Sequence, residues 1–310
     1  MDLVADILST LSLSTSVYFR AEFTAPFAVA VPEEQRVIRF HAVSAGSPWL
    51  GIPTGESAWL NAGDLVIVPH GRAHVIAHSP EAQPEPLADV IRSTRFDGSG
   101  PLVFGGGGAK SVMVCGHFAF AHEMLHPIIT SLPPLIHVVG RGATRFAWLE
   151  ELLAYISEET RTRGTGWQEV VQRLSEVLFI CVLREHMGRS PHSTGALTAI
   201  ADPRIGDALQ AIHADPAARW SVDTLAERAA MSKTVFAERF RHLVGVTPAR
   251  YVVLWRMLKA RSLLEKSELQ ASAVASRVGY ASEAAFNRVF KAYFGAPPGR
   301  YRRTHGDKSG

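Results

Sequence analysis

The last third of the chain contains one sequence unit twice, first as LAERAAMSKTVFAERFRHLVGVTPARY at residues 225–251 and then as VASRVGYASEAAFNRVFKAYFGAPPGRY at residues 274–301. The first halves align at an offset of 49 residues, which pairs Ala226 with Ala275. The second halves share a Phe, a Gly and a Pro at an offset of 50. The offset changes because one residue is inserted in the turn. These matches indicate that the chain carries two copies of one structural unit.

Each repeat predicts a short helix, a tight turn and a longer helix. Small residues in the first helix, such as Ala226 and Ala275, allow the two helices to approach closely. Ser232 and Ser282 precede the longer helices, where a serine side chain caps a free backbone N–H. Each longer helix places two phenylalanines on one buried edge and ends at a glycine, at positions Phe236, Phe240 and Gly245 and positions Phe286, Phe290 and Gly295. This is the helix-turn-helix plan, whose second helix enters the major groove of DNA.

The opposite face of each longer helix carries the residues that we expect to face DNA. In the first repeat these are Lys233, Thr234, Ala237, Glu238 and Arg241. In the second repeat they are Glu283, Ala284, Asn287, Arg288 and Lys291.

The connection between the repeats predicts one helix from Pro248 to about Glu265, with the proline in its first turn. Eighteen residues rise by about 27 Å, close to the ~34 Å between major-groove faces one turn apart. Two reading helices on such a rod fit successive grooves of one duplex. A helical bundle that binds a protein is the competing interpretation.

Charge supports a polyanionic partner for this region. Residues 201–310 hold eighteen Lys and Arg against ten Asp and Glu, a net charge of +8, whereas the other 200 residues hold fourteen against nineteen, a net charge of −5. The whole chain, 310 residues with 47% hydrophobic and 20% charged residues, predicts about two globular domains. It lacks a membrane-length apolar run and the features of a signal peptide, and its two cysteines, Cys115 and Cys181, fit a reducing cytoplasm.

Residues 198–305 resemble the tandem helix-turn-helix domain of AraC/XylS-type transcription regulators. The signature lies in AVASRVGYASEAAFNRVFKAYFGAPPGRYR at residues 273–302, with its Gly-Tyr turn, its Phe-x-Arg-x-Phe-Lys core and its Pro-Pro-x-x-Tyr-Arg end. The resemblance implies sequence-specific binding to DNA near promoters, and contact with RNA polymerase or its blockade.

Individual contacts follow from side-chain chemistry. We expect Asn287 and Arg288 to read base edges. Thr234 and Ala237 are small, so base reading falls more on the second repeat. The residues expected at phosphates are Arg241, Lys291, Arg300, Arg302 and Arg303. Arg239 and Arg256 serve either as phosphate contacts or in surface ion pairs.

The first 140 residues predict short strands, in runs at 27–32, 36–46, 58–71 and 111–120. Such runs are typical of an all-β sandwich or barrel. Residues 79–109 have little periodicity and predict a mobile loop. Its four glycines, 105–108, lack the Lys-Ser/Thr of a phosphate-binding loop.

Helical periodicity begins near Ala147 and predicts helices at 146–163 and 166–188. Their apolar stripe either caps the β domain or forms a dimer surface, and we favour the dimer surface. The Gly/Ser/Pro-rich residues 188–197 predict a linker.

Residues 20–125 carry a pattern that resembles the cupin barrels. Gly63, the Pro-His-Gly turn at 69–71, His74 and His78 resemble the second cupin motif, in which a turn presents a histidine into the barrel mouth. Only His41 remains of the first motif. The layout is similar to the cupin-headed branch of the AraC-type regulators.

We therefore expect an effector pocket formed by His41, His70, His74, His78, Cys115 and His117. We expect this pocket either to bind a small organic molecule or to respond to a redox signal through oxidation of Cys115. A bound transition metal is the alternative, held by His41, His74 and His78. No cofactor is required.

The letters HEMLH at 122–126 match the zinc-protease motif HExxH, with Glu123 as the base. Pro127 follows directly and ends the helix that this motif needs. We therefore expect no such catalytic site.

The predicted fold class is α+β, with two domains. A cupin-like β-barrel spans about 1–145 with trailing helices at 146–188, in a first domain of 1–190. A linker at 191–197 leads to an all-α tandem helix-turn-helix domain at 198–310. The predicted function is a ligand- or signal-responsive transcription regulator, not an enzyme, that binds double-stranded promoter DNA and RNA polymerase as a cytoplasmic homodimer. The alternatives are a metal-dependent cupin enzyme with a DNA-binding tail and an architectural DNA-binding protein without an effector.

Overall fold

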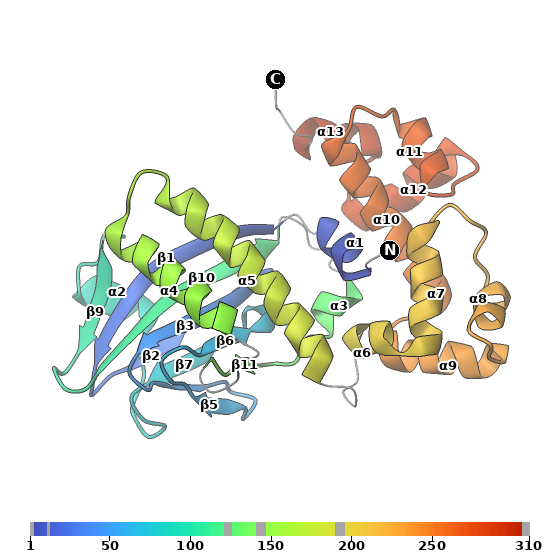
Figure 1. Cartoon of the computed structure of the whole chain (residues 1–310). Helices are drawn as coiled ribbons and strands as arrows, with labels where there is room; N and C mark the ends of the chain where they lie inside the picture. The colour runs from blue at the N-terminus through green and yellow to red at the C-terminus, as the bar shows by residue number, and fades with distance from the viewer. Residues whose placement is uncertain are drawn as a thin grey trace. The chain divides into compact units, whose positions relative to one another are not determined.

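The structure is a computed structural model that describes residues 3–10, 13–98, 100–120, 126–140, 147–189 and 196–305. These residues divide into two compact modules (Figure 1). We name them the β module, which holds the described residues of 13–120 and 133–188, and the helical module, which holds 3–10, 126–132 and 196–305.

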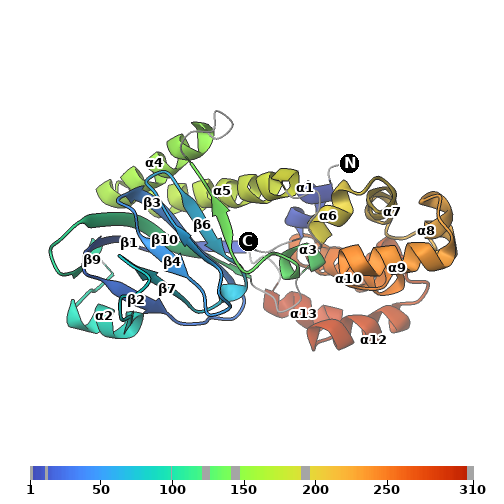
Figure 2. The same cartoon turned by 90° about the horizontal axis from the view of Figure 1, so that it is seen from below.

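The β module contains two sheets. The larger consists, in spatial order, of β11 (Ile136–Val138), β6 (Leu65–Val68), β3 (Val37–Ala45), β10 (Lys110–Phe120), β1 (Leu13–Thr24) and β9 (Pro101–Gly105). The smaller consists of β5 (Ser57–Trp59), β4 (Trp49–Gly51), β7 (His74–Ala77), β2 (Ala28–Val31) and β8 (Glu85–Pro86). Figure 2 shows β2, β4 and β7 of the smaller sheet lying along one side of the larger sheet. Apolar residues from both sheets form one shared core, which includes Phe23, Val29, Ile76 and Met113.

The two longest strands of the larger sheet, β1 and β10, are neighbours. They run antiparallel, from Leu13 opposite Phe120 to Thr24 opposite Lys110. The start of β1 and the end of β10 therefore lie at the same edge of the module.

Two helices cover the outer face of the larger sheet. Helix α4 (Ala147–Thr162) packs on β1, β3 and β10, and α5 (Trp167–Arg189) brings Phe179 against Phe118, with ring centroids 4.7 Å apart. Because this sheet is covered on both faces, β3 is buried from Val37 to Val43 without the polar alternation of a half-exposed strand. The predicted helices at 146–163 and 166–188 agree with α4 and α5.

The prediction of a mobile loop at 79–109 is wrong. The segment contains β8, α2 (Leu87–Ser93) and β9, and Val90 and Leu102 are fully buried in the core. These elements are short, so their apolar residues are too few to give a periodic pattern.

The helical module consists of α1 (Leu3–Ser9), α3 (Pro127–Thr130), α6 (Ala196–Ala201), α7 (Pro203–Ala214), α8 (Val222–Arg228), α9 (Lys233–Val244), α10 (Pro248–Lys266), α11 (Ala271–Arg277), α12 (Glu283–Phe294) and α13 (Pro298–His305). Helices α8 and α9 form the first repeat, α11 and α12 form the second, and α10 joins them.

Local signals account for the ends of these helices. Gly245 and Gly295 end α9 and α12 in the left-handed conformation, and Pro248 begins α10. Ser282 caps α12 by accepting a hydrogen bond from the backbone N–H of Ala285 at 3.2 Å. Ser232 occupies the predicted N-cap position of α9, but the predicted hydrogen bond of its side chain is not formed.

One division between the modules lies between residues 188 and 189, close to the predicted boundary at 190, but the residues before it do not form one module. Helices α1 and α3 come from the first 190 residues, yet they belong to the helical module. Residues 191–195 of the predicted linker lie outside the described residues, and its last two residues already belong to α6. Among the described helices, none has both the length and the apolar character needed to cross a membrane.

Candidate nucleic-acid interface and internal cavity

Helix α9 presents the predicted face of the first repeat to solvent. Phe236 and Phe240 are fully buried on its inner edge. Its predicted DNA-facing residues are exposed except for a half-buried alanine: Lys233, Thr234, Ala237, Glu238 and Arg241. Val235, 52% exposed, borders this face. Sequence reasoning missed Val235, because a valine beside Phe236 looks like a core residue.

Helix α12 repeats this arrangement in the second repeat. Phe286 and Phe290 are fully buried. The outer face consists of a half-buried asparagine and four exposed residues: Asn287, Glu283, Ala284, Arg288 and Lys291. The structure therefore gives the chain two similar helix faces, each backed by a buried phenylalanine pair.

Ion pairs and backbone contacts occupy several basic residues. Lys233 Nζ lies 3.0 Å from Asp223 Oδ2, and both side chains are largely exposed. Arg239 donates to the carboxylate of Asp202, which also caps α7. The guanidinium of Arg302 donates to the carbonyl oxygen of Leu269. This half-buried group therefore holds two segments together, and the contact of Arg302 with phosphate stays a prediction.

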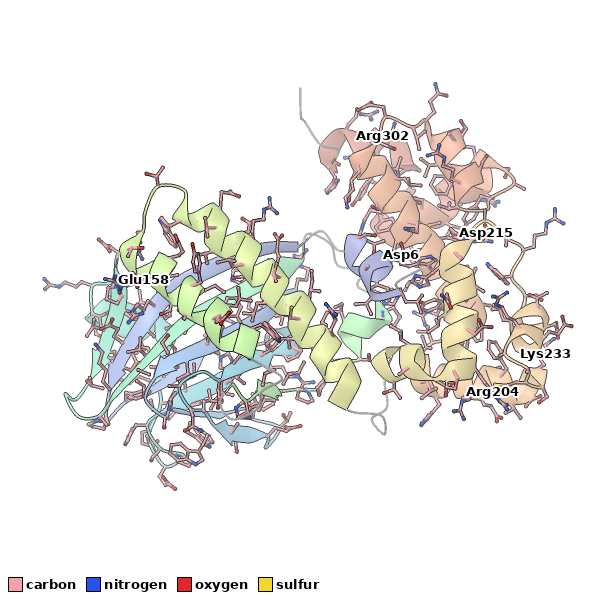
Figure 3. All side chains as sticks on the ribbon, in the orientation of Figure 1. Asp6, Glu158, Arg204, Asp215, Lys233 and Arg302 are labelled. Carbon is pink, nitrogen blue, oxygen red and sulfur yellow. The ribbon has the colours of Figure 1, made fainter. Side chains whose placement is uncertain are left out.

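A buried polar network lies at the centre of the helical module, and sequence reasoning did not predict it. We call it the Tyr251 network: Asp6, His126, His213, Tyr251 and Lys259. Tyr251 Oη lies 2.7 Å from His213 Nε2 and 2.9 Å from His126 Nε2. Asp6 binds His213 Nδ1 at 2.9 Å and Lys259 Nζ at 2.6 Å. Figure 3 shows Asp6 on α1 beside α10.

The hydrogen bonds of the network have one consistent direction. The Asp6 carboxylate only accepts, so His213 Nδ1 donates to it and Nε2 is left as an acceptor. The phenol of Tyr251 therefore donates to His213 and accepts from Nε2 of His126. Burial lowers the pKa of both histidines and raises that of Tyr251, which keeps all three neutral. Burial raises the pKa of Asp6, but hydrogen bonds from His213 and Lys259 outweigh it and lower the pKa.

The network gives His126 a structural role. His126 belongs to the HEMLH letters, whose His122 and Glu123 lie outside the described residues. It is buried against Tyr251 and Trp255, with ring centroids 5.6 and 5.8 Å away. It therefore packs α3 onto α10.

The β module encloses a cavity of about 20 Å³ between its two sheets. The wall is mainly apolar, with three polar or titratable residues: Phe19, Phe23, Val29, Val31, Ile76, Leu87, Arg39, His41 and Cys115. This volume holds about one water molecule. Of the predicted pocket residues, His41 and Cys115 lie in the wall.

Cys115, His41 and His74 form a chain of hydrogen bonds beside the cavity. His41 Nδ1 lies 3.1 Å from Cys115 Sγ, and His41 Nε2 lies 2.8 Å from His74 Nε2. His74 Nδ1 lies 2.9 Å from the carbonyl oxygen of Arg72, which only accepts. The direction is therefore fixed: His74 donates to Arg72, His41 to His74, and the Cys115 thiol to His41.

This chain keeps its members neutral. Burial, with the nearby His74, lowers the pKa of His41 well below its ordinary value, and burial lowers the pKa of His74 to about 4. Burial raises the pKa of Cys115 to about 12. The thiol is therefore not activated as a nucleophile.

Of the three predicted metal ligands, His41 and His74 are in contact, but His78 is directed elsewhere. Among the described residues, no group of three or more His, Cys, Asp or Glu side chains is arranged to hold a metal ion. The 2.8 Å between the Nε2 atoms of His41 and His74 is shorter than the ~3.3 Å of two imidazoles on one tetrahedral ion. His78 turns to the backbone of Phe27, with Nδ1 3.0 Å from its nitrogen.

The remaining predicted residues lie apart from the cavity wall. His70 is in the turn Pro69–Gly71 with a positive φ of 64°, and it is half-buried. His117 is half-buried on β10, opposite Arg39 on β3, and burial lowers its pKa. Strands β3, β7 and β10 contribute residues to the cavity wall, but only two of the six predicted side chains, His41 and Cys115, line the cavity.

Comparisons with known families cover both parts of the chain. A cupin family model matches residues 2–188, and a helix-turn-helix domain model matches residues 225–304. The first match includes α1 and α3 as well as the β module.

Known proteins are similar over nearly the whole chain. A putative AraC-like transcription regulator of Streptomyces lividans is 32% identical and covers 98% of each chain. The HTH-type transcriptional regulator AlkR of Acinetobacter baylyi is 29% identical, with 98% of this chain and 99% of AlkR covered. The DNA-binding domain of AdpA, solved in complex with a target DNA, is 35% identical over 33% of this chain and 92% of that chain, with a TM-score of 0.32. From the two family matches and the full-length relatives, the chain belongs to the AraC-type transcription regulators and carries an N-terminal cupin domain.

Proposed function

We propose that this DNA-binding transcription regulator reads two successive major-groove segments with α9 and α12 and responds to a signal received in the cavity of the β module. The proposed reading of DNA rests on one observation. In both α9 and α12, a buried pair of phenylalanines leaves the opposite face of the helix exposed to solvent. The requirement for access to promoter DNA favours a cytoplasmic location. RNA polymerase is the further partner that the family implies.

The assignment of base contacts rests on side-chain chemistry. Arg288 is exposed at the centre of the α12 face, where a guanidinium forms two hydrogen bonds with guanine. Arg241 and Lys291 lie in the last turns of α9 and α12 and supply phosphate contacts.

The small size of the cavity limits the signal. Without movement of its walls the cavity admits about one water molecule, so a larger effector needs aromatic residues such as Phe19 and Phe23 to turn aside. The wall favours a mainly apolar molecule with one polar group that hydrogen-bonds near His41 and Cys115. Oxidation of Cys115 is less favoured, because its buried thiol stays protonated.

Exposed apolar residues on α4 and α5 favour a homodimer. Val170, Val177 and Ile180 lie on one stripe of α5 and are 37%, 48% and 36% exposed, and Tyr155 of α4 is 59% exposed. Such residues at helical spacing are typical of a helix–helix interface. Val177→Asp is expected to convert the dimer to a monomer in sedimentation analysis. Gln168→Asp, which adds the same charge on another side of α5, is expected to leave it intact.

Selection from random duplexes tests the reading of DNA. The full-length chain is the correct sample, because a fragment that begins near residue 196 loses Asp6 and His126 of the Tyr251 network. We expect an enriched motif with two blocks about one helical turn apart. Salt-sensitive binding without any enriched motif contradicts the proposal.

A cavity-filling variant tests the sensor. Val29 is buried in the cavity wall, and Val29→Leu adds one methylene group there. A panel of small organic compounds, screened by thermal shift, is expected to yield one that stabilises the wild type and not Val29→Leu. Val112→Leu, buried in the same module but outside the cavity wall, is the control. Stoichiometric metal in the purified protein favours the metal alternative instead.

A further inference from the structure

The second repeat contacts the loop that leads into the first repeat, at a point near the middle of α10. We call it the Arg256 joint: Pro216, Ala217, Ala218, Arg256, Gly279 and Tyr280. Residues 216–218 belong to the loop that leads from α7 into the first repeat, whereas Gly279 and Tyr280 form the turn of the second repeat. Arg256 of α10 contacts both.

Arg256 binds the loop through two backbone carbonyls. Its Nε donates to the carbonyl oxygen of Pro216 and its Nη2 to that of Ala218, each at 2.8 Å. The guanidinium also lies over the ring of Tyr280, 5.8 Å from the centroid. Of the two predicted roles, phosphate contact and surface ion pair, neither describes this half-buried group.

The loop is shaped to offer these carbonyls. Asp215 accepts hydrogen bonds from the backbone N–H groups of Ala217 and Ala218 at 3.0 and 3.1 Å. The Trp220 indole donates to the carbonyl oxygen of Asp215 at 2.8 Å. Figure 3 shows Asp215 at the end of α7 that faces the second repeat. The loop that carries the carbonyl partners of Arg256 is therefore held by contacts within residues 215–220, without the second repeat.

Gly279 completes the joint from the other side. Its φ is +82°, and a Cβ at this position would lie 2.7 Å from the carbonyl oxygen of Ala217 and 2.9 Å from Nη2 of Arg256. The turn of the second repeat therefore rests directly on backbone of the α7–α8 loop, and only glycine fits there.

Packing along α10 places the joint between two separate cores. Tyr251, near the start of α10, packs on Phe240 of the first repeat with ring centroids 5.6 Å apart. Met257, Ala260 and Leu264 belong to the core of the second repeat. The joint lies at the changeover between these two cores, where bending or twisting of α10 changes the placement of α12 relative to α9 most.

We propose that the Arg256 joint fixes the separation and orientation of α9 and α12, and that it thereby sets the number of base pairs between the two blocks that the protein accepts. This inference rests on the proposed reading of DNA by both helices. One inserted base pair moves the second block by about 3.4 Å and by about 35° around the duplex. If α9 and α12 are held rigidly, only one of them can contact its block on such a site. If they can move relative to each other, both helices can still contact their blocks.

The experiment measures spacing selectivity rather than affinity. Binding constants are obtained for the selected duplex, for duplexes with one base pair added or removed between the blocks, and for a duplex with one block only. The wild type is expected to lose about tenfold or more on altered spacing, as for a lost base contact. Gly279→Ala and Arg256→Gln are expected to lose about threefold or less, or to prefer another spacing, with unchanged binding to the single block.

Matched controls separate the joint from general strain and charge. Gly245→Ala imposes the same backbone strain at φ +83°, but no atom lies within 4 Å of the added Cβ. Arg228→Ala removes a positive charge from the first repeat, where it pairs with Asp207. Any affinity that these controls lose is expected to be lost equally at every spacing.

The outcomes are distinct. Joint variants with the spacing selectivity of the wild type overturn the inference. A wild type that selects no two-block motif instead contradicts the proposed function. Thermal unfolding monitors the fold, and if Gly279→Ala does not fold, Arg256→Gln and the milder Arg256→Lys carry the test.

Discussion

The hydroxyl of Tyr251 lies 2.7 Å from Nε2 of His213, and both side chains are buried in the helical module. The same hydroxyl accepts from His126, so one phenol connects α10 with both α7 and α3. A buried donor or acceptor without a partner costs about 1–3 kcal/mol.

Tyr251→Phe removes this phenol and keeps the ring. His213 Nε2 and His126 Nε2 then lose their shared partner in a buried place. We expect the free energy of unfolding of the helical module to fall by about 2–4 kcal/mol, measured by urea unfolding. Tyr293→Phe, at a half-buried tyrosine of the second repeat, is the control and should change it by less than about 0.5 kcal/mol. Equal effects of the two substitutions contradict the role of the phenol.

Cys115 is expected to resist alkylation in the folded protein. With a pKa of about 12, only about one thiol in ten thousand is ionised at pH 8. Cys181 on α5 is half-buried and is not part of the hydrogen-bond chain of Cys115, His41 and His74. Iodoacetamide should therefore label Cys181 first and Cys115 only after unfolding, as followed by mass spectrometry of peptides. Comparable rates at both cysteines favour a redox sensor instead.

His74 is expected to make the stability of the β module depend on pH. Its folded pKa of about 4 lies below the ordinary value of 6.5, so between these values the unfolded chain binds one more proton than the folded chain. The stabilisation is complete above pH 6.5 and is lost as the pH falls, by about 1.4 kcal/mol per pH unit.

The check is urea unfolding at pH 7.5, 6.0 and 5.0. His74→Gln should reduce the pH slope by about that amount, whereas His242→Gln, at an exposed histidine of α9, should leave it unchanged. An unaltered slope in His74→Gln contradicts the lowered pKa of His74 in the folded protein.

Arg288→Ala is expected to relax selectivity at one base pair of the motif. The loss of a two-bond contact to guanine weakens binding to the selected site by about 1–3 kcal/mol. Binding to random DNA should change much less. Lys291→Ala, as a phosphate contact, should weaken binding to all sequences and lower the salt slope by about one. Equal losses of Arg288→Ala on selected and random DNA exclude base reading by Arg288.

Local sequence patterns predict the repeats well. The paired phenylalanines of α9 and α12, the glycines after them and Pro248 act within a few residues of their own position. Such signals are readable without a structure, because helix periodicity and helix ends are local properties. The same holds for α4 and α5, whose apolar spacing gave their bounds within two residues.

Long-range contacts leave no such pattern. Asp6 contacts His213 across 207 positions of sequence, and no sequence pattern near either residue indicates this contact. The assignment of α1 and α3 to the helical module was missed for this reason. The contact of the His78 ring with the backbone of Phe27 was not predicted either, because strand alternation gives the face of a residue but not the partner of its ring.

The assembly of the helical module from three stretches of chain has a consequence for synthesis on the ribosome. Helix α1 has seven residues, too few to persist alone in water. Its partner His213 emerges 207 residues later, about 10–40 s at ordinary elongation rates. The strands from β1 to β10 pair with one another long before then, with Leu13 next to Phe120. The β module therefore forms its sheet during translation, whereas the helical module is completed only when the C-terminal stretch binds the first-made segment of the nascent polypeptide.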